Sequence, residues 1–181
     1  MVRRPDLRRD MSIWRRLDIA SRYAWPGSVL LLGLLLVGVP LGLPGLAVLR
    51  AAYVMGSVFF WSLYRPVSVP APFVAGVGLL VDLLGLSPLG MWAVLLLLLQ
   101  ACVLAARRRL ITQSFLLTWA SFAALAAILS GLGWVMQSAL ELHALPLLPL
   151  LVQVLVACLV YPALAGLFIG AHRGAAAAEL A

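Results

Sequence analysis

The chain alternates long apolar runs with short breaks that are rich in arginine, proline and glycine. The apolar runs cover 25–43, 46–63, 72–86, 89–106, 115–140 and 147–171. An α-helix needs about 17–25 apolar residues to cross a bilayer, and most runs are near that length. The third run is short, so we expect its neighbours to shelter it, or its helix to extend back through Val67. The fifth is long, so we expect it to tilt or to end in an interfacial turn within 131–140.

Composition supports a membrane protein. Hydrophobic residues make up 65% of the chain, charged residues 10%, and the mean hydropathy is +1.11. A soluble domain is typically about 45–50% apolar and about 25% charged. So few charges could not cover the surface of a water-soluble fold of this size. We therefore predict an all-α integral membrane protein with six transmembrane helices.

The placement of arginine predicts the orientation. All 13 basic residues are arginine, and with six acidic residues the net charge is +7. Twelve of the arginines lie in the N-terminal tail, the loops at 64–71 and 107–112, or the C-terminal tail, and the alternate loops contain none. Cytoplasmic loops carry an excess of arginine and lysine, so both termini should be cytoplasmic. We divide the chain into a basic segment (1–24), a six-helix membrane domain (25–172) whose first span is not a cleaved signal peptide, and a short tail (173–181).

The basic N-terminal segment has helical amphipathicity. One face is apolar and includes Trp14, and the opposite face carries Arg8, Arg9, Arg15 and Arg16. This pattern is typical of an interfacial helix that binds anionic lipids. Docking of a cytoplasmic partner is the alternative. We do not expect nucleic-acid binding, because the arginines lie between apolar runs and no basic stripe carries interleaved aromatic residues.

Little in the sequence points to catalysis. No metal-ligand motif, nucleophile–base pattern or phosphate-binding loop is present, so we expect a non-enzymatic protein without a cofactor or metal. Two charges, Arg50 and Asp82, lie inside apolar runs at similar depth from the outer side. A charge in a span is costly unless it is paired or hydrated. We predict an interhelical ion pair between them, with a substrate or proton site as the alternative.

Small residues should mark the helix interfaces, because they let helix backbones approach closely in a membrane. Four glycines surround Asp82 in the sequence: Gly76, Gly78, Gly85 and Gly90. We expect them to let the third span pack closely against its neighbours.

The sequence between about 58 and 122 resembles the MreD family of bacterial rod-shape membrane proteins. The resemblance is carried by a Tyr64-Arg65-Pro66 turn, by the segment Gly78-Leu79-Leu80-Val81-Asp82-Leu83-Leu84-Gly85, and by Pro88-Leu89-Gly90. The basic loop Arg107–Arg109, Trp119 and, less specifically, Tyr161-Pro162 also fit.

The resemblance implies a non-enzymatic subunit of the elongasome in the bacterial inner membrane. Such a subunit binds the bitopic protein MreC and acts indirectly with the actin-like MreB, the glycosyltransferase RodA and a transpeptidase in lateral peptidoglycan synthesis. It also implies a fold similar to the substrate-binding subunits of energy-coupling-factor transporters. A small-solute-binding transporter component is therefore the alternative. That alternative needs a polar pocket open to the outer side. The sequence offers few outward polar residues to line one.

Overall fold

The computed structural model describes the backbone of residues 13–38, 45–85, 87–143 and 145–178 of the 181, with side chains described from residue 26 to residue 168 within these ranges. The described chain is all-helical. Its helices are α1 (Ile13–Gly38), α2 (Leu46–Tyr64), α3 (Ala71–Gly85), α4 (Met91–Leu110), α5 (Phe115–Glu141) and α6 (Leu147–Ala178), with one 3-10 turn, η1 (Pro66–Ser68), between α2 and α3. These helices coincide with the six predicted runs. However, α1 begins well before residue 25 and α6 continues past residue 172, so neither proposed segment boundary falls at a helix end.

Length and composition make the chain a multi-pass membrane protein. Four of the described helices, α2, α4, α5 and α6, are long and apolar enough to cross a bilayer. The apolar part of α1 (Pro26–Gly38) and the whole of α3 are shorter. The long α5 is one continuous helix to Glu141, so the interfacial turn expected within 131–140 does not occur.

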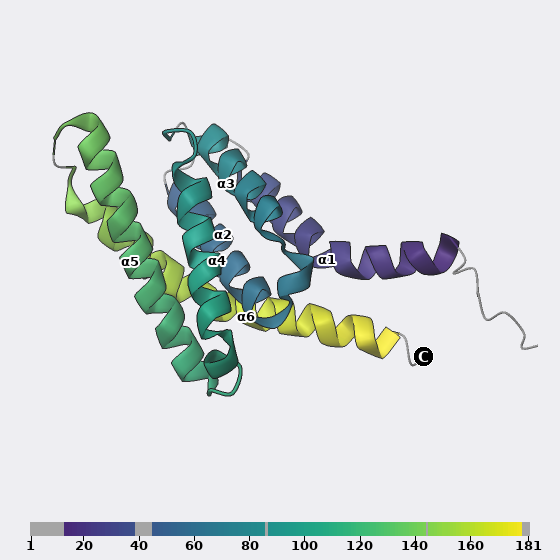
Figure 1. Ribbon diagram of the computed structural model, residues 1–181. Helices are drawn as coiled ribbons and strands as arrows, with labels where there is room; N and C mark the ends of the chain where they lie inside the picture. The colour runs from purple at the N-terminus through teal and green to yellow at the C-terminus, as the bar shows by residue number, and fades with distance from the viewer. Residues whose placement is uncertain (1–12, 39–44, 86, 144, 179–181) are drawn as a thin grey trace, which may run out of the picture.

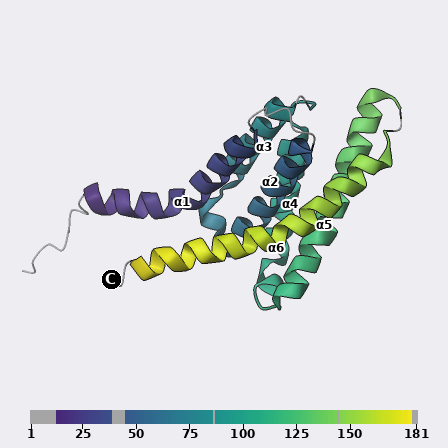
Figure 2. The same ribbon diagram turned by 180° about the vertical axis from the view of Figure 1, so that it is seen from behind.

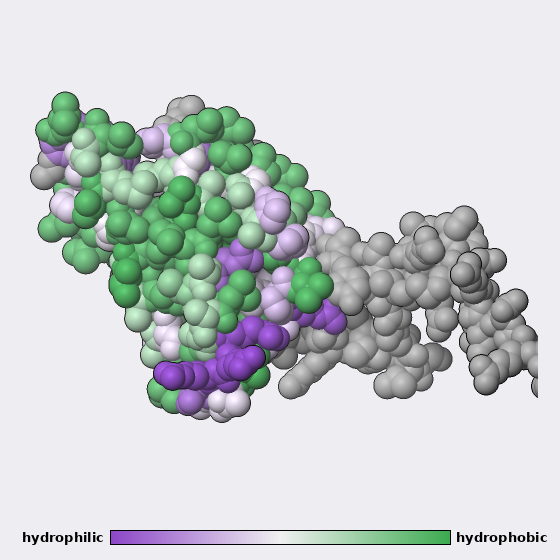
Figure 3. Space-filling model, in the orientation of Figure 1, coloured by the Kyte–Doolittle hydropathy of each residue, from purple (hydrophilic) through white to green (hydrophobic). Residues whose placement is uncertain are grey.

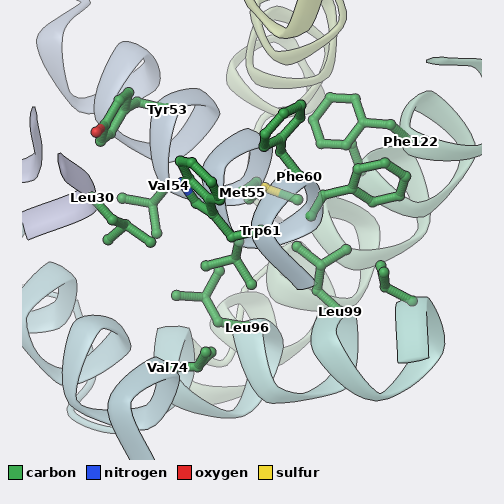
Figure 4. Close-up of a cluster of buried hydrophobic side chains, with 14 of the residues drawn as sticks. Leu30, Tyr53, Val54, Met55, Phe60, Trp61, Val74, Leu96, Leu99 and Phe122 are labelled. Atoms are coloured by element: carbon green, nitrogen blue, oxygen red, sulfur yellow. The ribbon is translucent and has the colours of Figure 1, made fainter. Parts of the chain in front are cut away.

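Helix α2 forms the centre of the bundle. Every residue from Ala51 to Leu63 is buried, as expected for a helix that is apolar on all sides and enclosed by others. Figure 4 shows side chains such as Leu30, Val74 and Phe122 gathering around those of α2. Figures 1 and 2 show α5 and the first half of α6 leaning away from α1, α3 and α4.

An aromatic cluster joins α2 to α5 and α6. The rings of Phe59, Phe122 and Tyr161 meet with centroid distances of 4.4–5.5 Å, and the Phe122 and Tyr161 rings are stacked. Phe168 packs against Phe60 and Trp61, both at 5.1 Å. Such pairs add about 0.5–1.5 kcal/mol each beyond area burial. They therefore hold α6 against α2.

The short α3 depends on its neighbours. The link before it is not α-helical, and Val69 within this link is completely buried. The amide of Gln100, in the middle of α4, donates a 2.7 Å hydrogen bond to the Val69 carbonyl. A buried backbone carbonyl outside a helix needs a hydrogen-bond partner, and Gln100 supplies it here. A side chain of α4 therefore satisfies a backbone carbonyl of this link, and the helix of the third run begins at Ala71 without extending back through Val67.

The apolar part of α1 runs in the same direction as α3. Near its beginning, Gly27 lies against the ring of Phe73, at the start of α3. At its end, Gly38 lies against the side chain of Leu84, at the end of α3. The two short helices therefore extend over the same part of the bundle.

Candidate functional site

Asp82 caps the start of α4 from the end of α3. Its Oδ2 accepts a 2.8 Å hydrogen bond from the Gly90 N–H, and its Oδ1 accepts one of 3.1 Å from the Trp92 N–H. The Ser87 hydroxyl donates a third, at 3.2 Å. The carboxylate is almost fully buried. The first N–H groups of a helix have no partner within it and carry partial positive charge, so a carboxylate is favourable there.

Arg50 binds a different partner near the same end of the bundle. Its Nη1 donates a 3.0 Å hydrogen bond to the carbonyl of Leu84, in the last turn of α3. A cation is favourable at the end of a helix, where carbonyl groups lack partners. Arg50 is half-buried, whereas Asp82 is enclosed.

The predicted direct ion pair between Arg50 and Asp82 does not form. Each side chain binds backbone groups at a helix end instead: Asp82 the N–H groups of α4, and Arg50 a carbonyl of α3. Both charges therefore obtain partners without meeting. The amide of Gln153 donates a hydrogen bond to the Ser130 hydroxyl at 3.3 Å.

The four glycines differ in their surroundings. A Cβ on Gly78 would lie 2.3 Å from the Cα of Ala93, so α3 and α4 touch backbone to backbone there. A Cβ on Gly76 would meet nothing within 4 Å. At Gly85 the nearest atom would be Nη2 of Arg50, at 3.3 Å. Gly90 has φ +93° and open space around it, so its role is conformational: it turns its N–H towards Asp82.

The Tyr64-Arg65-Pro66 turn ends α2, as predicted. The Arg65 N–H donates to the Trp61 carbonyl at 2.7 Å, and Pro66 then begins η1. Nε of Arg107, near the end of α4, donates a 2.8 Å hydrogen bond to the carbonyl of Leu63. This contact joins the ends of α2 and α4. Figure 3 shows hydrophilic surface gathered at this end of the molecule, where Figure 1 places the α4–α5 turn.

Two residues of the resemblance, Trp119 and Pro162, act together. Pro162 lies inside α6 and has no N–H to offer the carbonyl four residues earlier, that of Cys158. The indole Nε1 of Trp119, on α5, donates to this carbonyl at 2.9 Å. Tyr161 is buried beside them in the aromatic cluster.

The proposed lipid or partner surface is only partly described. Arg8 and Arg9 lie outside the described residues. Trp14, Arg15 and Arg16 belong to the beginning of α1, of which only the backbone is described there.

A cavity of about 360 Å³ opens between α2, α4, α5 and the first half of α6, at the end of the bundle that contains Arg50. Its polar lining side chains are Arg50, Ser87, Ser130, Gln137 and Gln153, with the indoles of Trp92 and Trp134. Most of the other lining residues are apolar, so polar groups are a minority of the cavity wall. These residues lie on separate apolar runs, and their convergence depends on how the helices pack.

Sequence reasoning missed Gln100 and Arg107 as helix-joining residues. Gln100 had a recognisable signal, since an amide inside an apolar run must find a partner to avoid the cost of burial. Arg107 had no signal that separates it from Arg108 and Arg109.

No family model, curated protein or solved structure matches the chain.

Proposed function

We propose that the chain is the membrane subunit of a bacterial elongasome, resembling MreD, which binds an MreC-like bitopic partner in the inner membrane. The observation that supports this most is how the residues of the resemblance are used. Asp82, Gly78 and Gly90 join α3 to α4, and Trp119 joins α5 to α6. Their hydrogen bonds and contacts hold helices together, as a non-enzymatic scaffold requires. All six helices would cross the membrane in a fold like that of energy-coupling-factor binding subunits.

The test is deletion of the gene in the bacterium that encodes it. We expect rod-shaped cells to round, and we expect the tagged protein to co-purify with a bitopic, coiled-coil partner. Its effects on MreB, RodA and a transpeptidase should follow indirectly through that partner. Rods of normal width and growth in a clean deletion would argue against the proposal.

A motif variant tests whether the turn after α2 contacts a partner. Arg65→Lys keeps the positive charge but removes the planar guanidinium that can form two parallel hydrogen bonds. If Arg65 binds a partner in this way, the lysine variant should restore shape poorly to deletion cells, at a normal protein level. Full complementation would leave only a charge role, such as contact with anionic lipid phosphates.

The second candidate function is a solute-binding component of a transporter. The cavity beside Arg50 favours it, because ligand pockets usually occupy about 300–1,000 Å³ and carry a few polar groups on an apolar lining. Rounded cells would support the shape subunit. Loss of uptake of one small solute with unchanged shape would support the transporter component.

A further inference from the structure

The cavity beside Arg50 has one cationic group. The guanidinium has five N–H donors, and within the described residues it makes a single hydrogen bond, to the Leu84 carbonyl. The other donors remain available to an occupant, because Arg50 lines the cavity and is half-buried. A guanidinium is well suited to a phosphate or carboxylate, which it can bind through two parallel hydrogen bonds.

The acidic groups near the cavity do not cancel this charge by direct contact. The Asp82 carboxylate is enclosed and accepts its three hydrogen bonds from Ser87, Gly90 and Trp92. Glu141 is exposed and bonds to Gln137 and His143. Neither carboxylate lines the cavity. An anion could therefore approach Arg50 without meeting a carboxylate at the cavity wall.

The deeper part of the cavity is mostly apolar. Along α4 its lining runs from Met91 to Leu99, which is a depth of roughly 12 Å along the helix. Leu96, Leu129 and Leu150 add aliphatic surface from three helices. The deeper polar side chains, Ser130 and Gln153, bond to each other. A ligand that fills this space needs an apolar body behind its charged group.

We propose that this cavity binds an anionic amphiphile, with a phosphate or carboxylate on Arg50 and an apolar tail between α4, α5 and α6. Such a ligand can come from the outer leaflet of the membrane or from water. Figure 1 shows α5 and the start of α6 leaning away from α4, and the cavity occupies this region. The inference does not depend on the elongasome role, because the cavity is built entirely from this chain.

Two tryptophans in the cavity wall provide the measurement. Trp92 and Trp134 line the cavity, and the Trp134 indole is fixed by a 3.2 Å hydrogen bond to the Leu145 carbonyl. The full chain is placed in phosphatidylcholine nanodiscs. One sample contains a minor fraction of brominated phosphatidylglycerol, and a second contains the same fraction of brominated phosphatidylcholine. We expect brominated phosphatidylglycerol to quench tryptophan fluorescence more than brominated phosphatidylcholine does. The difference between the two lipids should be smaller in a Trp134→Phe variant.

Substitutions assign the preference to the charge. Arg50→Gln should weaken the preference for the anionic lipid by about tenfold or more, since it removes charge-assisted hydrogen bonds. Arg50→Lys should keep much of it, because a lysine still attracts phosphate. Arg108→Gln, an equal loss of charge on an exposed residue at the other end of α4, should leave it unchanged. Thermal unfolding of each variant shows whether it is folded.

A soluble alkyl phosphate, added to the protein in neutral detergent, tests the second source. One outcome is that the alkyl phosphate changes tryptophan fluorescence only when Arg50 is present, while the two brominated lipids quench equally. That result would assign the same site to a ligand from water. Equal quenching by the two brominated lipids together with no effect of the alkyl phosphate would overturn the inference. An anionic preference that survives in Arg50→Gln would overturn it as well.

Discussion

At the scale of single residues, Asp82 and Arg50 show how a membrane protein can satisfy a buried charge without an ion pair. The ends of helices carry unpaired N–H and C=O groups, and these groups must find partners. Asp82 takes up the N–H groups at the start of α4, and Arg50 takes a carbonyl at the end of α3. One arrangement therefore gives partners to two charged side chains and to backbone groups at two helix ends.

The cap predicts a graded effect of substitution. Asp82→Ala leaves the N–H groups of Gly90 and Trp92 without their acceptor, which costs about 1–3 kcal/mol for each buried group left unbonded. Ser87→Ala is the control, because it removes one hydroxyl donor and leaves both backbone bonds. We expect a clearly larger drop in thermal unfolding midpoint for Asp82→Ala, measured in detergent. Equal drops would mean that the cap does not stabilise α4.

The glycines of α3 offer a matched pair. Gly78→Ala places a methyl group against the backbone of Ala93, which cannot move aside as a side chain could, so α3 and α4 must separate. We expect a loss of about 1–3 kcal/mol, as for overpacking in a tight core. Gly76→Ala meets open space and should be neutral or slightly stabilising, since alanine favours a helix over glycine. Similar unfolding midpoints for the two variants would contradict the close contact.

At the scale of helices, the contact between α5 and α6 depends on a proline. The Cys158 carbonyl would be unsatisfied in the membrane without the Trp119 indole, because Pro162 cannot bond to it. Two residues that contribute separately to the family resemblance are thus parts of one structural feature.

A double-mutant cycle tests this dependence. Trp119→Phe keeps an aromatic ring but removes the N–H, and should destabilise the protein by about 1–3 kcal/mol. In a Pro162→Ala background, the new backbone N–H can bond to the Cys158 carbonyl. The same Trp119→Phe change should then cost measurably less. An unchanged cost in both backgrounds, read from unfolding midpoints, would show that the indole bond has another role.

The apolar runs predicted the helices well, because length and hydropathy are local properties of the sequence. The end of α2 at Tyr64 follows directly from Arg65-Pro66. The partners of the polar residues could not be predicted in the same way. Gln100 reaches Val69 and Arg50 reaches Leu84 because α3 and the link before it pack beside α2 and α4. That geometry comes from packing, which periodicity does not encode.

At the scale of the whole molecule, the proposal of six crossings rests on contacts between helix ends. The bond from Arg50 to Leu84 puts the start of α2 beside the end of α3. If the long α2 crosses the membrane, the short α3 must bring the chain back. The apolar part of α1 runs alongside α3, from Phe73 to Leu84. If α2 crosses the membrane, α3 and the apolar part of α1 therefore extend over the same depth, although both are shorter than the four long helices.

The topology is the prediction that joins sequence and structure most directly. With six crossings, the C-terminus and the turns at 65–70 and 111–114 lie on the arginine-rich, cytoplasmic side, and the turn near 142–143 lies outside. We expect a phosphatase reporter, active only outside, to work when inserted after Leu142 and to fail after Thr112 or Ala181. A fluorescent protein that folds only inside should show the opposite pattern.

The site after Ser68 separates six crossings from four. It is cytoplasmic if α1 and α3 cross, and outside if only α2, α4, α5 and α6 do. Phosphatase activity after Ser68 would therefore reject six crossings, even with the C-terminus in the cytoplasm.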